Sequence, residues 1–179
     1  MRKNESLIAG VDEVGKGSLF GPVFAGAVIL NKSNEINLLS EGLKDSKKLS
    51  FRQRNNLVPL IKKNSMSWSL GQASAREIDN LGIRTATEKA MLRALEKFSS
   101  PPELIIVDGI LPIRMWTGKQ RTQIRGESYF PSIAAASVLA KDARDELMKR
   151  LAEKYFLYGL ERNKGYGTKC HTSSILKEG

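Results

Sequence analysis

The sequence has one cysteine, Cys170, and one histidine, His171. A lone cysteine excludes an internal disulfide framework and a cysteine-based structural zinc site, and a lone histidine excludes a mechanism that needs two. No apolar run approaches the ~20 residues that a bilayer span requires. The first apolar run, at 7–11, is broken by Asp12 and Glu13, so no signal peptide fits. We therefore expect a cytoplasmic protein with no membrane partner.

Positive charge is abundant, because 29 Lys and Arg outnumber 19 Asp and Glu and give a net charge of +10. Residues 1–90 hold 14 basic against 9 acidic residues, and residues 91–179 hold 15 against 10, so the charge belongs to the whole chain. A basic surface of this kind favours a polyanionic partner such as nucleic acid. Solubility alone is the other interpretation. The sequence shows no repeat, low-complexity tract or long linker, which predicts a single domain.

Apolar and alternating segments predict strands at 7–14, 23–30, 65–72, 104–107 and 122–124. Helical spacing predicts helices at 50–63, 74–79, 85–98 and 132–155. Ser50 is the expected N-cap of the first helix, and Trp68 and Trp116 are expected to be packing residues. The buried side of the last helix is expected to carry Ile133, Ala136, Ala140, Leu147 and Leu151. A meander of strands followed by alternating strands and helices predicts an α/β fold with a mixed sheet covered by helices.

Two adjacent carboxylates, Asp12 and Glu13, stand at the end of the first apolar strand. Acids near a core are costly unless a cation neutralises them. Successive strand residues point to opposite faces, so the two converge on one site only if the chain bends, which Gly15 and Gly17 permit. The other interpretation is that Glu13 points to solvent. The segment also matches the start of a phosphate-binding loop, but Gly17 stands where a magnesium-binding Ser or Thr is required.

Asp108 follows the strand predicted at 104–107 and precedes Gly109. Ligands of α/β sheets gather beyond strand ends, so Asp108 is well placed to join the first two acids. An Asp-Gly pair after a strand also forms an ordinary turn. Clustered acids with no adjacent His or Cys favour a hard cation, Mg²⁺ or Mn²⁺, over zinc.

Six motifs occur along the chain at 10–17 with 21–23, 43–50, 67–71 with 77–79, 107–109, 134–141 with Arg144 and Asp145, and 165–168 with His171. In this order they resemble the ribonuclease HII family over nearly the whole chain. The resemblance implies a ribonuclease H-like fold, a five-stranded mixed sheet flanked by helices. It also implies divalent-metal endonuclease action that leaves 5′-phosphate and 3′-hydroxyl ends. The family usually continues past residue 179 with a basic helical segment, so we expect a single catalytic domain, 1–179, without that extension.

The resemblance implies four catalytic and metal-binding carboxylates, Asp12, Glu13, Asp108 and Glu127. The fourth is usually Asp in ribonuclease HII. Glu127 and Lys16, where that family usually has Arg, are similar to the sister family ribonuclease HIII. A preference for continuous hybrids therefore stays open as an alternative. Asp145 is the rival fourth ligand, but an i to i+4 pair with Lys141 would give it a structural role.

The substrates that the resemblance implies are RNA/DNA hybrids and DNA with embedded ribonucleotides. We expect the protein to be a monomer, and the resemblance also implies which residues bind the substrate. The backbone that approaches the ribose 2′-OH would be that of Gly15, Lys16 and Gly17. Tyr166 would pack on the adjacent deoxyribose and sense the RNA-to-DNA junction; its other interpretation is a core tyrosine. The basic candidates for phosphate contacts are Lys47, Lys48 and Lys141. A non-catalytic nucleic-acid-binding module would not need the acids, and a phosphotransferase would need a nucleotide-phosphate loop that is not evident.

Overall fold

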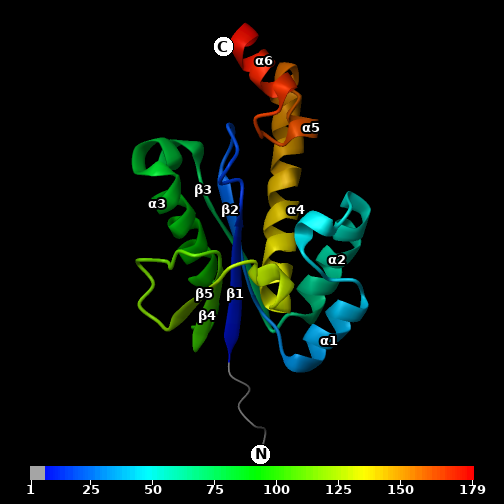
Figure 1. Cartoon of the computed structure of the whole chain (residues 1–179), viewed down its shortest axis with the longest axis vertical. Coiled ribbons are helices and arrows are strands. Elements are labelled where there is room, and N and C mark those ends of the chain that lie inside the picture. The colour runs from blue at the N-terminus through cyan, green and yellow to red at the C-terminus, as the bar shows by residue number, and fades with distance from the viewer. Residues whose placement is uncertain (1–6) are drawn as a thin grey trace, which may run out of the picture.

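A computed structural model of the chain describes residues 7–179, which contain a five-stranded mixed sheet (Figure 1). The strand order is β3-β2-β1-β4-β5. The first three strands form an antiparallel meander, and β1, β4 and β5 are parallel, which confirms the predicted mixed sheet. The basic start of the chain, Arg2 and Lys3, lies outside the described residues. The strands are β1 (Ile8–Val14), β2 (Val23–Ile29), β3 (Ser67–Ala73), β4 (Leu104–Asp108) and β5 (Gln120–Gln123).

Helices cover both faces of the sheet, with α3 on one face and α1, α2 and α4 on the other (Figure 1). The α-helices are α1 (Lys32–Ser40), α2 (Phe51–Asn64), α3 (Ala75–Leu95), α4 (Pro131–Lys154), α5 (Leu160–Asn163) and α6 (Lys169–Glu178). Three 3₁₀ turns are η1 (Ser46–Lys48), η2 (Gly126–Ser128) and η3 (Phe156–Tyr158). The sequence pattern did not predict α1, α5 and α6, which are short.

The helix predictions are otherwise confirmed, with two instructive differences. Helix α3 runs through both predicted helices, and the break between them is Gly82, whose φ of 78° is left-handed. Helix α4 buries Ile133, Ala136 and Ala140 as expected, whereas Leu147 and Leu151 are half-buried. The second half of α4 instead buries Met148 and two charged residues, Arg144 and Asp145. Those charges have partners on other elements, which hydrophobic periodicity does not detect.

Small residues let the helices approach the sheet closely. A Cβ at Gly71 of β3 would lie 2.0 Å from the Ala90 carbonyl oxygen of α3. The closely packed face of β3 therefore carries Ser69, Gly71 and Ala73, not the apolar residues that predict the strand. Trp68 is 37% exposed, with the Lys62 ammonium 5.0 Å from its ring centroid, so the expectation of a packing role for Trp68 is wrong. Trp116 does pack against the core on the α3 side.

Two side chains, from α3 and from the residues just after it, cover the border of the sheet at β3. Lys97 Nζ donates to the Leu70 carbonyl oxygen at 2.6 Å, and Arg93 Nη1 donates to that of Gln72 at 2.8 Å. Strand β5, at the other border, has four residues. Across residues 7–179, no helix combines the length and the apolar character needed to cross a bilayer.

Candidate metal centre

The candidate site lies where β1 and β4 end side by side. Their parallel pairing runs to Val11 opposite Val107, so Asp12 and Asp108 follow at the carboxyl ends of neighbouring strands. A cleft of about 450 Å³ opens there. It is lined by Asp12, Glu13, Val14, Gly15, Lys16, Gly17, Ser46, Lys47, Asp108, Glu127, Ser137, Lys141 and Tyr166. The cleft therefore brings together the four candidate carboxylates and most of the candidate substrate-binding residues. Lys48 and Asp145 do not line it.

Asp12 and Glu13 reach this cleft without a bend in the strand. Strand β1 stays paired with β2 through Val14, so the expected bend at the two acids is wrong. Their side chains leave on opposite faces of the sheet, since Asp12 lies toward α4 and Glu13 also lines a second hollow with Arg84 of α3. Both line the cleft because it crosses the open end of the β1–β4 pair.

The acids at this site carry uncompensated negative charge. Burial raises the pKa of Asp12 well above its ordinary value, and the charges of Glu13, Asp108 and Glu127 raise it further. Burial also raises the pKa of Glu13, although Lys16 Nζ, 3.8 Å from Glu13 Oε1, opposes that shift. The site therefore favours either a bound proton or an added cation.

Glu127 is held by two serines that the sequence analysis did not single out. The Ser46 N–H donates to Glu127 Oε2 at 2.8 Å, and the Ser137 hydroxyl donates to Oε1 at 2.9 Å. The two serine hydroxyls lie 2.9 Å apart. Burial and the neighbouring Asp45 carboxyl raise the pKa of Glu127. Asp45 accepts from the Lys47 N–H and caps η1. A serine among buried alanines of α4 was the available signal for Ser137.

The donor set fits a hard divalent cation, since the site offers carboxylate oxygens and no His or Cys. In the side-chain arrangement seen across residues 7–179, no three acids, His or Cys lie close enough together to bind one ion. Local donors hold the carboxylates instead: Asp12 Oδ1 accepts from the Glu13 N–H at 2.8 Å, and Asp108 Oδ1 from the Gly126 N–H at 2.6 Å. Cation binding therefore requires the carboxylates to turn toward the centre of the cleft.

Asp145, the rival fourth ligand, lies in a buried ion pair. Arg54 Nη2 is 2.6 Å from Asp145 Oδ2, and Lys141 Nζ is 3.8 Å from the same oxygen. The expected pair with Lys141 one helical turn away is therefore confirmed. This network joins α2 to α4 and leaves Asp145 outside the cleft. The geometry favours Glu127 as the fourth carboxylate.

Arg144 connects the turn that contains Gly15 and Gly17 to the chain around Tyr166. It is fully buried, and its guanidinium carbon lies 5.4 Å from the centroid of the Tyr166 ring. Gly15 has a φ of 95°, and a Cβ there would lie 2.3 Å from Arg144 Nε, so this position requires glycine. The guanidinium donates at 2.7–3.0 Å to Ser18 Oγ and to the carbonyl oxygens of Phe20, Pro22 and Lys164. The second half of α4 carries many charged residues, so nothing in the sequence separates the buried Arg144 from its charged neighbours.

The single histidine has a structural position. His171 is buried in α6, and its Nδ1 lies 3.0 Å from the Tyr166 carbonyl oxygen. Tyr166 itself is half-buried, lines the cleft and forms an isolated β-bridge with Ser18. The backbone of Tyr166 is thus held from two sides beside the cleft that this residue lines.

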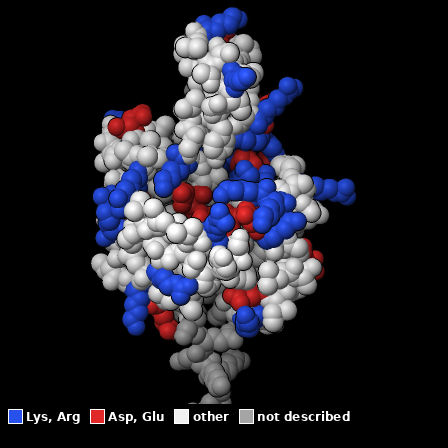
Figure 2. Space-filling view, viewed as in Figure 1, with Lys and Arg blue, Asp and Glu red and all other residues white. Residues whose placement is uncertain are grey.

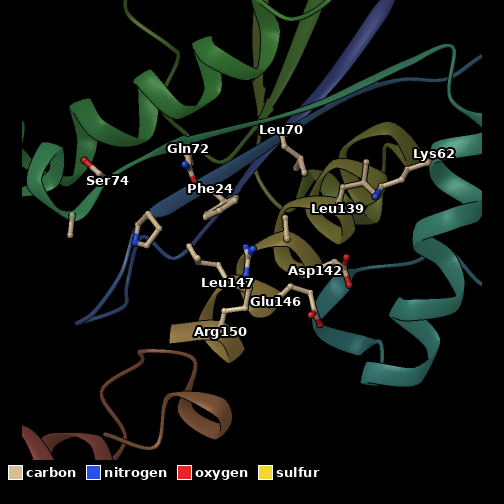
Figure 3. A pocket seen from close by; sticks show the side chains of 13 residues that line it. Phe24, Lys62, Leu70, Gln72, Ser74, Leu139, Asp142, Glu146, Leu147 and Arg150 are labelled. Atoms are coloured by element: carbon tan, nitrogen blue, oxygen red, sulfur yellow. The ribbon is translucent and has the colours of Figure 1, made fainter. Parts of the chain in front are cut away.

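A larger hollow, about 590 Å³, lies between β3 and α4 and holds no comparable chemistry (Figure 3). Its floor is apolar, with Phe24, Leu70 and Leu139, and its acids Asp142 and Glu146 lie on α4 (Figure 3). None of the four candidate carboxylates lines it. Hollow size is therefore a poor guide to the site in this fold.

A mixed five-stranded sheet with helices on both faces and acids at the ends of β1 and β4 defines a ribonuclease H-like nuclease. The chain belongs to the ribonuclease HII family, since the family model described as Ribonuclease HII matches residues 9–179. Ribonuclease HII of Prochlorococcus marinus strain NATL1A is 76% identical over 179 residues, which is all of this chain and 92% of that protein. The chain is accordingly an endoribonuclease, and metal dependence and cleavage at embedded ribonucleotides are typical of its family.

Solved structures agree with this fold. Ribonuclease H2 from Pyrococcus horikoshii OT3 superposes with a TM-score of 0.81 at 26% identity, covering 96% of this chain and 85% of that one. Bst-RNase HIII in complex with Mn²⁺ superposes with a TM-score of 0.74 at 17% identity, covering 96% and 70%. The five-stranded ribonuclease H-like fold predicted from the sequence is thus confirmed.

Proposed function

We propose that the cleft at the ends of β1 and β4 is the active site of an endoribonuclease. Its substrates are the RNA strand of RNA/DNA hybrids and ribonucleotides embedded in duplex DNA, and its products carry 5′-phosphate and 3′-hydroxyl ends. The observation that carries this proposal is one cleft lined by four carboxylates, the glycine turn and Tyr166. A non-catalytic binding module would not place four acids where a phosphate must enter, because they repel it without a cation.

The residues that would hold the cations are Asp12, Glu13, Asp108 and Glu127. When bound there, two Mg²⁺ or Mn²⁺ ions supply charge that activates a water and stabilises the leaving 3′-oxygen. The raised pKa of Asp12 supports this assignment, since a buried acid beside three others needs an opposing charge. Ser46 and Ser137 orient the Glu127 carboxylate through its two oxygens. The ribonuclease HIII structure mentioned above contains Mn²⁺, which is consistent with either cation.

Recognition of the ribose 2′-OH falls to the backbone of Gly15, Lys16 and Gly17. A Cβ at Gly17 would meet nothing within 4 Å, so the space beside this residue is open to a sugar. Tyr166 would pack on the deoxyribose that follows the ribonucleotide. For phosphate contacts, Lys47 and Lys141 line the cleft, and Lys48 is exposed beside it on η1.

A ribonuclease HIII-like preference for continuous hybrids is the second candidate, favoured by the identities of Lys16 and Glu127. The deciding experiment compares two duplexes, one with a single ribonucleotide and one a continuous hybrid, each with Mg²⁺, with Mn²⁺ and with a chelator. Cleavage of the single ribonucleotide at its 5′ side, only with metal, supports the first candidate. Cleavage of the hybrid alone supports the second. Binding of both without cleavage contradicts the assignment of the active site.

We further propose that residues 1–179 act as one catalytic domain and as a monomer. The strands of the described residues form a single sheet, and the helices pack on it in two hydrophobic cores, one on each face. Light scattering coupled to size-exclusion chromatography would give a mass near 19.8 kDa for a monomer. A mass near twice that value would contradict it.

A further inference from the structure

A second hollow, of about 280 Å³, shares a wall with the active-site cleft on the side of α3. Glu13, Lys16 and Asp108 line both. The far wall of the second hollow consists of α3 and the loop that follows β4. The second hollow therefore adjoins the active-site cleft, and none of the roles given above explains it.

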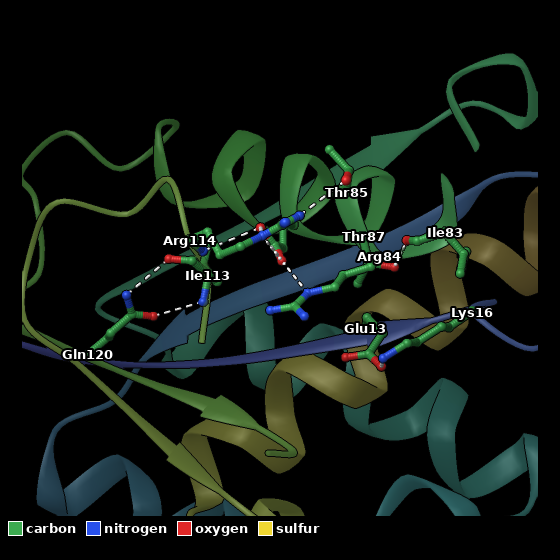
Figure 4. Close-up of polar contacts among 10 residues, drawn as sticks. Glu13, Lys16, Ile83, Arg84, Thr85, Thr87, Ile113, Arg114 and Gln120 are labelled. Carbon is green, nitrogen blue, oxygen red and sulfur yellow. Dashed lines mark hydrogen bonds and ion pairs between the residues drawn. The ribbon is translucent and has the colours of Figure 1, made fainter. Parts of the chain in front are cut away.

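Two arginines share one buried carboxylate, that of Glu88, on the far wall. Arg84 lines the hollow together with Glu88, and Arg114 follows Ile113 on the adjoining loop without lining it. Glu88 is buried in α3, and its Oε1 lies 3.1 Å from Arg84 Nε and 2.9 Å from Arg114 Nε. The Arg114 backbone N–H also donates to Glu88 Oε2, at 3.3 Å. Two positive groups thus share one negative group, so the cluster keeps a net positive charge. Figure 4 shows Arg84 extending from α3 toward β1, where Glu13 and Lys16 lie.

The loop that carries Arg114 is anchored, so the cluster is preorganised. Ile113 is fully buried, and its N–H and carbonyl oxygen bond to the Gln120 side chain at 2.9 and 3.0 Å (Figure 4). Arg114 Nη2 donates to Thr85 Oγ1 at 3.1 Å. Within residues 7–179, the Nη atoms of Arg84 have no hydrogen-bond partner. Its side chain is 46% exposed, so that edge of the guanidinium is available to a ligand.

We infer that Arg84, held in place by the Glu88 carboxylate that it shares with Arg114, binds a phosphate of the nucleic-acid substrate other than the one that is cleaved, an inference that rests on the function proposed above. A guanidinium whose plane is fixed through Nε presents its outer N–H groups to an anion, and fixed donors bind at a lower entropic cost. Figure 2 shows basic side chains on both sides of the acidic centre of this face. Lys47 and Lys141, in the active-site cleft, would bind one part of the nucleic-acid backbone. The arginine cluster beside the second hollow would bind another part.

The test uses the substitutions Arg84→Gln and Arg114→Gln, made singly so that Glu88 always keeps one arginine. Affinity for a duplex with one ribonucleotide is measured by fluorescence anisotropy in chelator over a range of salt. We expect binding about ten-fold weaker in Arg84→Gln, because a charge-assisted hydrogen bond is lost, and a smaller loss in Arg114→Gln, which only supports Glu88. The slope of log Kd against log salt should fall by about 0.9 in Arg84→Gln, the value for one phosphate. With Mg²⁺, KM should rise while kcat is retained.

Arg93→Gln is the matched control. Arg93 lies on the same helix, pairs with Glu77 at 2.7 Å and is 43% exposed, but it lines neither hollow. The Arg93→Gln variant should bind the duplex with the same affinity as the unchanged protein. Equal weakening in Arg93→Gln, or unchanged affinity and salt slope in Arg84→Gln, would overturn the inference. Glu88 would then serve only to connect α3 with the loop that carries Arg114.

Duplexes with single methylphosphonate groups locate the contact. Neutralising the contacted phosphate should weaken binding to the unchanged protein and have no further effect on Arg84→Gln. Additive losses at every position would overturn the assignment. Because binding is measured without metal, it is independent of cleavage. A protein that binds in this pattern but cleaves neither substrate would therefore count against the proposed function alone.

Discussion

Asp12 has 4% of its surface exposed and lies beside three other acids, so its negative charge destabilises the protein when no cation is bound. Asp12→Asn should abolish cleavage, because a proposed metal ligand is lost, and should raise the melting temperature in chelator. The raised pKa means that the folded state binds a proton that the unfolded state releases, so stability falls as pH rises through the Asp12 pKa. The stability gained by Asp12→Asn should be fully present above the pKa of Asp12 in the folded protein and absent below about pH 4.

Thermal unfolding across this pH range and a cleavage assay check the prediction. The exposed Asp79, changed to Asn, is the control and should alter neither property. A variant of Asp12 that kept near-normal turnover would show that the metal centre is wrongly assigned.

Glu127 and Asp145 have different environments and should respond differently to loss of charge. Glu127→Gln should lower cleavage strongly, because the carboxylate charge is lost. Glu127→Asp keeps that charge at a slightly different position, so it should stay active or change its preference between Mg²⁺ and Mn²⁺. Asp145→Asn should destabilise the fold by ~3–5 kcal/mol, because Arg54 then loses its buried partner. Denaturant unfolding and single-turnover rates separate the two effects. An active Glu127→Gln beside a folded but inactive Asp145→Asn would make Asp145 the fourth ligand.

At the scale of residues, the sequence identified the acids but not the groups that hold them. Asp12, Glu13 and Asp108 follow apolar strands, a pattern visible without coordinates. Ser46 and Ser137 are common residues on different elements, and their role appears only when η1 and α4 lie together. Metal ligation itself stays a prediction, because the carboxylates are turned toward local donors.

At the scale of elements, Arg144 connects the turn after β1 to the chain between α5 and α6. Tyr166→Ala should lower cleavage at a single ribonucleotide more than cleavage of a continuous hybrid, because only the single ribonucleotide requires junction sensing. Arg144→Lys keeps the charge but cannot make all four hydrogen bonds, so it should change the ratio of the two rates in the same direction.

The ratio of kcat/KM on the two substrates is the readout, because simple loss of folded protein would lower both rates equally. Cys170→Ser, an exposed change in α6, should leave the ratio unchanged. Equal losses on both substrates for Tyr166→Ala would assign Tyr166 a general structural role and favour the hybrid-specific alternative.

The elements that the sequence predicted well are those with a long buried face. Helix α2 begins after Ser50, whose side chain accepts from the Gln53 N–H as the N-cap rule requires. Helix α1 was missed because only Leu38 of its nine residues is buried, so it carries no apolar stripe. The alternation in β3 correctly predicted a strand, but it does not show that the tightly packed face carries small residues, which close contact with α3 requires.

At the scale of the whole molecule, the +10 charge should make binding to a hybrid strongly dependent on salt. If three phosphates are neutralised, the slope of ~0.9 per phosphate predicts roughly 40-fold weaker binding at 200 mM than at 50 mM salt. Fluorescence anisotropy in chelator measures this without cleavage. Affinity that hardly changed over this range would contradict a basic docking surface. The control is the same hybrid with an uncharged backbone in place of the phosphates.

The two edge strands of the sheet, β3 and β5, matter for a protein of which several copies can bind along one polyanion. An open strand edge is a template on which a second chain can add its own strand, the first step toward fibres. Here Lys97 and Arg93 occupy carbonyl oxygens of β3 that an incoming strand would need, and β5 offers only a short, polar border. Crowding along a duplex therefore brings copies of this enzyme together without letting their sheets join.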